Sequence, residues 1–168
     1  YYTSAEKAPK KYQLMIVFED DSFLAFTVSM YGSIYAFKGE FDNPYYQGSI
    51  HKLCPLDERF DKAYFISLIR NLKKDISAKA LLATEQRIPG LGNGVCQDIL
   101  FNARISPKRK ISTLSEEDTD RLFNTVKSTL EEMTCRGGRD TEKDLYGALG
   151  NYRTILSLSL IHISEPTR

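Results

Sequence analysis

The chain has 168 residues, of which 42% are hydrophobic and 27% are charged, a composition typical of a globular protein. Its 23 lysines and arginines nearly balance its 22 aspartates and glutamates, so the overall charge does not indicate a nucleic-acid-binding protein. No apolar run approaches the roughly 20 residues that a membrane span needs, and no signal segment opens the sequence. We therefore expect a cytoplasmic protein without membrane contact.

The three cysteines and two histidines restrict the metal and disulfide chemistry of the chain. Cys54, Cys96 and Cys135 lie far apart and form no CxxC pair, which excludes a disulfide framework and a metal knuckle. His51 and His162 are the only histidines, which disfavours a zinc site. We expect no cofactor in this chain and interpret each cysteine as a small buried hydrophobic residue.

The first part of the chain predicts short β-strands. Residues 12–19 and 23–30 are rich in β-branched and aromatic residues and flank a short turn, which predicts a hairpin. A third short strand is predicted over 33–38, and residues 40–50 are interpreted as a loop because they contain glycine, asparagine, proline and aspartate. Three strands are too few for a closed β-domain, so we expect part of a sheet upstream of Tyr1.

A composition shift near Pro55 marks the start of a helical half. Apolar residues recur there at helical spacing, and each run follows a residue that can cap a helix. Residues 89–92 (Pro-Gly-Leu-Gly) must end the second of these helices, and Gly137 and Gly138 end the last, before a loop and short strand over 139–157. The predicted helices run from Asp61 to about 72, from Ser77 to about 85, from Asn93 to about 103, and from Ser115 to 133.

Positive charge is concentrated in one part of the chain. Residues 1–60 carry 6 basic and 8 acidic side chains, a net charge of −2. Residues 73–110 carry 8 basic and 3 acidic side chains, a net charge of +5, which can attract polyanions. A solvated surface is the alternative interpretation. The basic residues are Lys73, Lys74, Lys79, Arg87, Arg104, Lys108, Arg109 and Lys110.

Residues 79–101 combine a short helix, a glycine-rich double turn and a second helix. Glycines let backbone N–H groups approach an oxygen ligand, and the start of the second helix adds unpaired N–H donors and a positive dipole end. This combination predicts a phosphate site, with a plain connection between helices as the alternative. Lys79 is a second candidate, since a cation in the first turn of a helix is disfavoured by roughly 0.3–1 kcal/mol; a solvated lysine is the alternative.

The order of motifs in this half resembles the helix–two-turn–helix of the formamidopyrimidine-DNA glycosylase and endonuclease VIII family. The resemblance covers residues 10–157; residues 55–61 resemble the linker into the helical domain, and 137–141 and 150–152 resemble the lesion-side loop. The motifs that carry it are Lys79, Gly90-Leu91-Gly92-Asn93, Leu100-Phe101 and Ile105-Ser106-Pro107.

The resemblance implies an α+β fold. We expect part of an antiparallel β-sandwich over residues 1–54 and a helical helix–two-turn–helix DNA-binding domain over 55–157. Residues 158–168 resemble the translation of a sequencing-library adaptor, and we expect them to be read-through.

The resemblance also implies residue roles at a DNA surface. Asn93 and the backbone from Gly90 to Gly94 would hold phosphates beside the lesion, and Lys79 would reach the neighbourhood of a flipped-out nucleotide. Capping of its own helix is the alternative role for Asn93, and the two roles are compatible. The predicted DNA-binding residues are Lys79, Gly90, Gly92, Asn93, Gly94, Arg109 and Tyr152.

The chain departs from the family pattern in its chemistry. The family uses an amino-terminal proline as imine-forming nucleophile and an adjacent glutamate as acid/base, whereas this sequence starts with Tyr1 and Tyr2. We therefore assign no catalytic residue and expect this chain alone to be inactive. Residues 30–32 (Met-Tyr-Gly) stand where many relatives have Arg-Phe-Gly, so the resemblance implies no particular lesion preference. Any zinc would belong to a carboxy-terminal finger outside this sequence.

The resemblance implies a base-excision-repair DNA glycosylase and AP lyase that removes oxidised bases. Its partner would be double-stranded DNA with a damaged base or an abasic site, bound by a monomer. Two alternatives remain. One is a non-enzymatic nucleic-acid-binding module, since ribosomal proteins also use a helix–two-turn–helix with glycines, but the strands before Pro55 and the spacing of Lys79 argue against it. The other is a catalytically inactive homologue, which would share all of these motifs.

Overall fold

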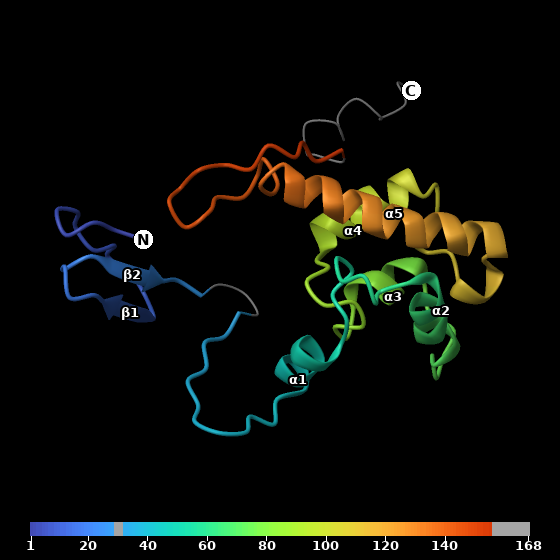
Figure 1. Ribbon diagram of the computed structural model, residues 1–168, viewed down its shortest axis with the longest axis horizontal. Helices are drawn as coiled ribbons and strands as arrows, with labels where there is room; N and C mark the ends of the chain where they lie inside the picture. The colour runs from blue at the N-terminus through green and yellow to red at the C-terminus, as the bar shows by residue number, and fades with distance from the viewer. Residues whose placement is uncertain (29–31, 156–168) are drawn as a thin grey trace, which may run out of the picture. The chain divides into compact units, whose positions relative to one another are not determined.

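The computed structural model describes residues 1–28 and 32–155 (Figure 1). Met30 and Tyr31, which stand where many relatives have Arg-Phe, and the predicted read-through tail, 158–168, lie outside these residues. Among the described residues, no helix is both long and apolar enough to cross a membrane.

Contacts within the chain define two compact units. Residues 1–41 with 143–148 form the first unit, and residues 42–142 with the described residues from 149 onward form the second. The segment that precedes Pro55 from residue 42 therefore groups with the helical part of the chain. The α+β class expected from the sequence is confirmed, with strands in the first unit and helices in the second.

The first unit contains the predicted hairpin. Strand β1 (Leu14–Val17) pairs in antiparallel register with β2 (Phe23–Phe26), and the two form a two-stranded sheet. The turn between them is closed by Asp20, whose Oδ1 accepts hydrogen bonds from the Ser22 N–H at 3.1 Å and Oγ at 2.6 Å. Asp21 takes the left-handed conformation at φ 61°, which aspartate tolerates better than most residues.

The predicted third strand at 33–38 is wrong, because these residues form neither strand nor helix. A strand exists only where its backbone N–H and C=O groups pair with a neighbour. Among the described residues, β1 and β2 pair with each other and neither pairs with 33–38. The alternation of apolar residues indicated the strand, but alternation does not supply a partner.

The predicted loop at 40–50 is also wrong over most of its length, because it contains helix α1 (Pro44–His51). Asn43 caps this helix, with its side chain accepting from the N–H groups of Tyr45 at 3.0 Å and Tyr46 at 3.2 Å. Proline is favoured in the first helical turn because its fixed φ suits a helix and the position needs no N–H. Two of the residues that suggested a loop, Asn43 and Pro44, are thus the start signal of a helix.

The second unit contains four further α-helices, and the predicted caps of three of them are confirmed. Asp61, Ser77 and Ser115 each accept a backbone N–H from the first turn of the helix that follows. Ser115 and Asp118 form a reciprocal capping box. The helices are α2 (Lys62–Arg70), α3 (Ala78–Ala83), α4 (Asn93–Asn102) and α5 (Glu116–Cys135), with a 3-10 turn η1 (Ile111–Thr113) before α5.

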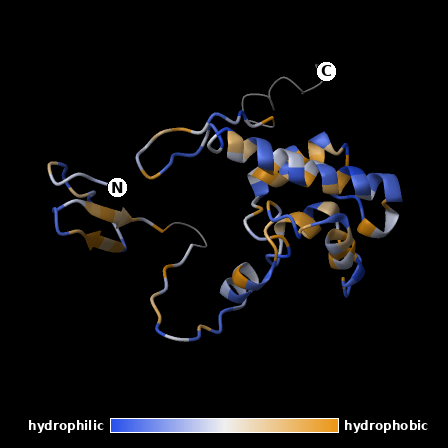
Figure 2. Cartoon of the chain, in the orientation of Figure 1, coloured by the Kyte–Doolittle hydropathy of each residue, from blue (hydrophilic) through white to orange (hydrophobic). Residues whose placement is uncertain are grey.

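The core of this unit lies between α2, α3, α4 and α5. Helix α5 is largely hydrophilic in Figure 2, and its buried positions, Leu122, Val126, Thr129 and Met133, follow helical spacing on one face. The side chains less than 2% exposed include Phe60, Phe65, Leu81, Leu82, Ile88, Ile99, Leu100, Leu122 and Val126. Of the three cysteines, only Cys96 is buried; the prediction is wrong for Cys54 and Cys135, which are exposed.

Two successive turns join α3 to α4. In the first, Glu85 and Gln86 both have left-handed backbones, at φ 56° and 48°. Lys52 Nζ donates to the Gln86 carbonyl at 2.7 Å, and Arg87 Nη1 donates to the Ala80 carbonyl at 3.0 Å. These side chains satisfy carbonyl groups at the end of α3 and in the turn, and so stabilise a conformation that non-glycine residues disfavour.

The second turn is held by its apolar residues. Ile88 is 1% exposed and Leu91 is 7% exposed, so the turn is anchored in the core on both sides of Pro89 and Gly90. Gly90 has φ +77°, a conformation that other residues adopt only with strain. The chain then enters α4 directly.

Candidate nucleic-acid interface

The amino end of α4 presents free backbone donors. Its N-cap is Gly92, with no side-chain cap hydrogen bond, and the first helical bond runs from the Cys96 N–H to the Gly92 carbonyl at 3.0 Å. Within the described residues, the N–H groups of Asn93, Gly94 and Val95 therefore have no acceptor. Together with the positive end of the helix dipole, they form a site for an anionic oxygen.

Asn93 is the first residue of α4 and not its cap, so the predicted capping role is wrong. Gly92 has the extended backbone of an N-cap, at φ −91° and ψ 174°, and thereby moves Asn93 one position into the helix. The Asn93 side chain is exposed and makes no hydrogen bond within the described part of the chain. It is therefore available to a ligand.

The three glycines around Asn93 differ in whether the fold requires a glycine at their position. Gly90 needs its positive φ, and Gly94 has the guanidinium of Arg139 where a Cβ would lie. Gly92 has neither reason, because its φ is negative and a Cβ added there would meet nothing within 4 Å. A glycine that the fold does not require is consistent with close approach of a ligand to the backbone.

Lys79 is the second residue of α3, and its side chain is exposed. No ion pair forms on it within the described residues. Its charge reaches the first turns of α4: burial raises the pKa of the Cys96 thiol to about 11, and the Lys79 ammonium opposes that rise. The positive charge of Lys79 is therefore felt at the amino end of α4, where the free N–H groups lie.

The basic segment 107–110 is fixed beside the start of α3 by backbone hydrogen bonds. The Lys79 N–H donates to the Pro107 carbonyl at 3.1 Å, and the Ala78 N–H donates to the Arg109 carbonyl at 2.9 Å. Ser77 and Lys110 form an antiparallel bridge. Residues far apart in the sequence therefore lie close together, with the exposed Lys108 and Lys110 on the segment that pairs with the start of α3.

Arg109 is bound within the protein. Its guanidinium lies 2.7 Å from the Asp118 carboxylate and donates to the Thr113 carbonyl at 2.9 Å. Burial acts to raise the pKa of Asp118, but hydrogen bonds from Ser115 and the charge of Arg109 outweigh it and hold that pKa below its usual value. Arg109 therefore ties the basic segment to the capping box of α5.

Tyr152 lies inside the protein, at 3% exposure. Burial raises its pKa to about 12, and the carboxylate of Asp98, with which its hydroxyl is hydrogen bonded, adds to that rise. Asp98 is a fully buried residue of α4 and also accepts the N–H of Ile155 at 3.2 Å. Tyr152 thus attaches the segment after α5 to α4, and it can influence a DNA surface only through the residues that it positions.

Arg139 is a residue of this region that the sequence reasoning missed. It follows Gly137 and Gly138 in the loop after α5, and its guanidinium lies against Gly94 at the amino end of α4. The signal available in the sequence is an arginine directly after a glycine pair, within the segment 137–141 that resembles the lesion-side loop. The close approach to α4 depends on tertiary structure and has no signature in the sequence.

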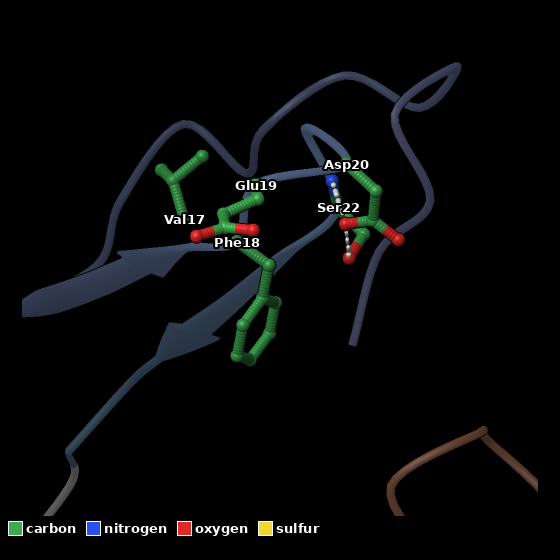
Figure 3. Close-up of a pocket in the computed structure, with 5 residues that line it drawn as sticks. All are labelled: Val17, Phe18, Glu19, Asp20 and Ser22. Atoms are coloured by element: carbon green, nitrogen blue, oxygen red, sulfur yellow. Dashed lines mark hydrogen bonds between the residues drawn. The ribbon is translucent and has the colours of Figure 1, made fainter.

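The first unit has an open hollow at its hairpin turn, with a different chemistry. Figure 3 shows that Glu19 and Asp20 contribute carboxylates there, with Asp20 bonded to Ser22. The side-chain and backbone hydrogen bonds from Ser22 lower the pKa of Asp20, which keeps it ionised. An acidic hollow repels phosphates, so we do not assign nucleic-acid binding to it.

Two helices joined by two turns, with the second helix presenting a free amino end, define a helix–two-turn–helix protein. The sequence profile of the family described as "Formamidopyrimidine-DNA glycosylase H2TH domain" matches residues 53–144, more than half of the chain. The chain belongs to this family, which confirms the family resemblance seen in its motifs.

Individual relatives agree with this assignment. Formamidopyrimidine-DNA glycosylase of Listeria monocytogenes serotype 4b (strain F2365) is 29% identical over 161 residues, covering 91% of this chain and 56% of the relative. The protein of the same name from Wolbachia pipientis subsp. Culex pipiens is 37% identical over 90 residues, covering 54% of this chain and 32% of that protein. The chain therefore spans about half the length, or less, of these relatives.

A solved structure shares the fold. The crystal structure of the MutM (Fpg) protein from Thermus thermophilus matches with a TM-score of 0.52 and 30% sequence identity. The match covers 58% of this chain and 38% of the solved chain.

Proposed function

We propose that this chain binds the phosphate backbone of double-stranded DNA through the amino end of α4. The observation that carries the proposal is the set of free N–H groups at residues 93–95, next to a glycine at 92 that the fold itself does not require. Among residues 1–28 and 32–155, the Asn93 amide makes no hydrogen bond and the Lys79 ammonium forms no ion pair, so both add to this site.

The physical basis of this binding is the match between these groups and a phosphate. Charge-assisted hydrogen bonds from N–H groups to an anion are roughly twice as strong as neutral ones, and the helix dipole favours an anion at the same place. Backbone contacts carry no base information, so they fix the position of the protein on the duplex without reading its sequence. Sequence-independent binding of this type has a Kd of roughly 1–100 µM at physiological salt.

The names of the relatives support a proposal for the activity of the whole protein. We propose that it is a DNA glycosylase and AP lyase that removes oxidised bases in base-excision repair, in the cytoplasm and as a monomer. Its substrate would be duplex DNA with a damaged base or an abasic site. An enzyme of this kind must turn the target nucleotide out of the helix, which requires a firm hold on the neighbouring phosphates. The residues around the amino end of α4 are suited to that hold.

A salt titration of duplex binding tests the DNA-binding proposal. The chain is titrated against a duplex with a central abasic-site analogue and against the same duplex intact, from low to physiological salt. We expect log of the association constant to fall linearly with log of the salt concentration, with a slope near −0.9 for each phosphate bound. Binding without salt dependence, or no binding at low salt by a folded chain, would refute the proposal.

A further inference from the structure

The guanidinium of Arg139 lies where a side chain at position 94 would lie, at the amino end of α4. A Cβ added to Gly94 would overlap Nη1 of Arg139 and lie 2.7 Å from its Cζ, so the guanidinium rests directly on the glycine backbone. The Arg139 side chain is 20% exposed. Gly94 has no positive φ, so this contact is what its missing side chain permits.

The loop that carries Arg139 is fixed to α4 through Tyr152. The Tyr152 N–H donates to the Gly138 carbonyl at 2.9 Å, and the Asp140 N–H donates to the Tyr152 carbonyl at 2.8 Å. The Tyr152 hydroxyl in turn is hydrogen bonded to Asp98, a buried residue of α4 itself. The position of the Arg139 guanidinium is therefore determined by the fold and not by the side chain alone.

The internal partners of Arg139 leave its charge only weakly compensated. Its Nη1 donates to Glu142 Oε1 at 3.0 Å, and its Nε donates to Thr154 Oγ1 at 3.4 Å. Glu142 is 66% exposed, and ion pairs with exposed partners contribute little to stability. A guanidinium at the positive end of a helix dipole is electrostatically disfavoured. An arrangement that breaks a local rule in this way is typical of a functional position.

We infer that Arg139 is a second phosphate ligand at the amino end of α4, and that Glu142 holds it in the free protein and releases it when DNA binds. This inference rests on the proposed DNA binding. Guanidinium groups bind phosphate oxygens through two parallel N–H donors, which the single carboxylate contact of Glu142 does not use fully. A bound phosphate would compensate both the guanidinium and the free N–H groups of α4, and Glu142 would turn to solvent.

Charge-removing variants of the pair test the inference in the same salt titration. We expect Arg139→Gln to bind duplex about tenfold more weakly and to lower the salt slope by about 1. Glu142→Gln removes the competing carboxylate and should bind more tightly. Arg139→Lys keeps the charge, so it should restore the slope but not the full affinity. The matched controls are Arg136→Gln and Glu132→Gln. These two exposed residues form an ion pair, 2.8 Å apart, at the end of α5, and neither substitution should change the salt slope.

Gly94→Ala provides a second test that leaves Arg139 in the sequence. The new methyl group must displace the guanidinium, so this variant should lose affinity, and adding Arg139→Gln to it should have little further effect. Unchanged affinity and slope in folded Arg139→Gln, or additive losses in the double variant, would overturn the inference. Absence of salt-dependent binding by the unmodified chain would instead refute the proposed function, so the two failures are distinguishable. If Arg139→Gln does not fold, weaker or unchanged binding by Glu142→Gln overturns the inference.

Discussion

At the scale of single residues, Gly92 is a position where the fold would accept a serine but a bound phosphate would not. Its backbone is that of an ordinary N-cap, where serine is preferred over glycine by a few tenths of a kcal/mol. A serine there has open space for its side chain. Its hydroxyl would accept one of the N–H groups that we assign to a phosphate, and its Cβ would stand in the path of the ligand.

Gly92→Ser should therefore change stability and DNA binding in opposite directions. We expect the thermal midpoint to stay the same or rise slightly, while the affinity for duplex DNA falls severalfold. Thermal melts and fluorescence anisotropy on the same preparation measure the two effects. Equal affinity in a variant with an unchanged midpoint would show that the amino end of α4 is not in contact with DNA.

Two basic residues that looked alike in the sequence should behave differently. Lys79→Ala removes a cation that forms no ion pair in the described part of the chain, so we expect the salt slope to fall by about 1 and the stability to stay the same or rise. Arg109→Ala breaks the ion pair with Asp118, so we expect a lower thermal midpoint and little change in slope. The reverse pattern, with Arg109 controlling the slope, would exclude our assignment of Lys79.

The residue types of the candidate site were predictable, but their local roles were not. The glycines, Asn93 and Lys79 could be selected because the chemistry of phosphate binding requires such groups close together. Whether Gly92 or Asn93 caps α4 depends on one backbone ψ angle, and asparagine and glycine both suit an N-cap. Tyr152 and Arg139 needed the tertiary structure, because their partners Asp98 and Gly94 are more than 40 positions away in the sequence.

At the scale of elements, caps decided where prediction succeeded. Asp61, Ser77 and Ser115 each precede an apolar run at helical spacing, so cap and periodicity agreed. Helix α1 has the same kind of start at Asn43 but no buried residue, so periodicity gave no support. The third strand failed for the opposite reason: its pattern was present, but no partner strand pairs with it among the described residues.

The capping box of α5 should contribute measurably to the second unit. Ser115→Ala removes the acceptor for the Asp118 N–H, at 3.0 Å, and we expect a loss of about 1 kcal/mol in the free energy of unfolding. Asn43→Ala is the matched comparison, since it uncaps a helix without buried residues and should leave global unfolding unchanged. Urea denaturation followed by circular dichroism measures both, and equal losses in the two variants would contradict this account.

At the scale of the whole molecule, the charge distribution of the sequence becomes a spatial arrangement. The basic residues of 73–110 lie before α3, in α3, in the turns that precede and follow α4, and in the segment that pairs with the start of α3. Backbone pairing of 76–79 with 107–111 brings cations nearly 30 positions apart in sequence onto one region. The sequence predicted the net charge but not this pairing, because isolated bridges between loops leave no periodic pattern.

The central claim is that the amino end of α4 meets DNA phosphates, and amide NMR tests it most directly. The ¹⁵N-labelled chain is titrated with a duplex that contains an abasic-site analogue, and the resonances of Gly92, Asn93, Gly94 and Val95 are followed. We expect their N–H signals, above all those of Asn93 and Gly94, to shift strongly downfield to saturation and to return when salt is added, while those of β1 and β2 shift less. Saturable binding that shifts other amides and leaves these four unchanged would contradict the claim.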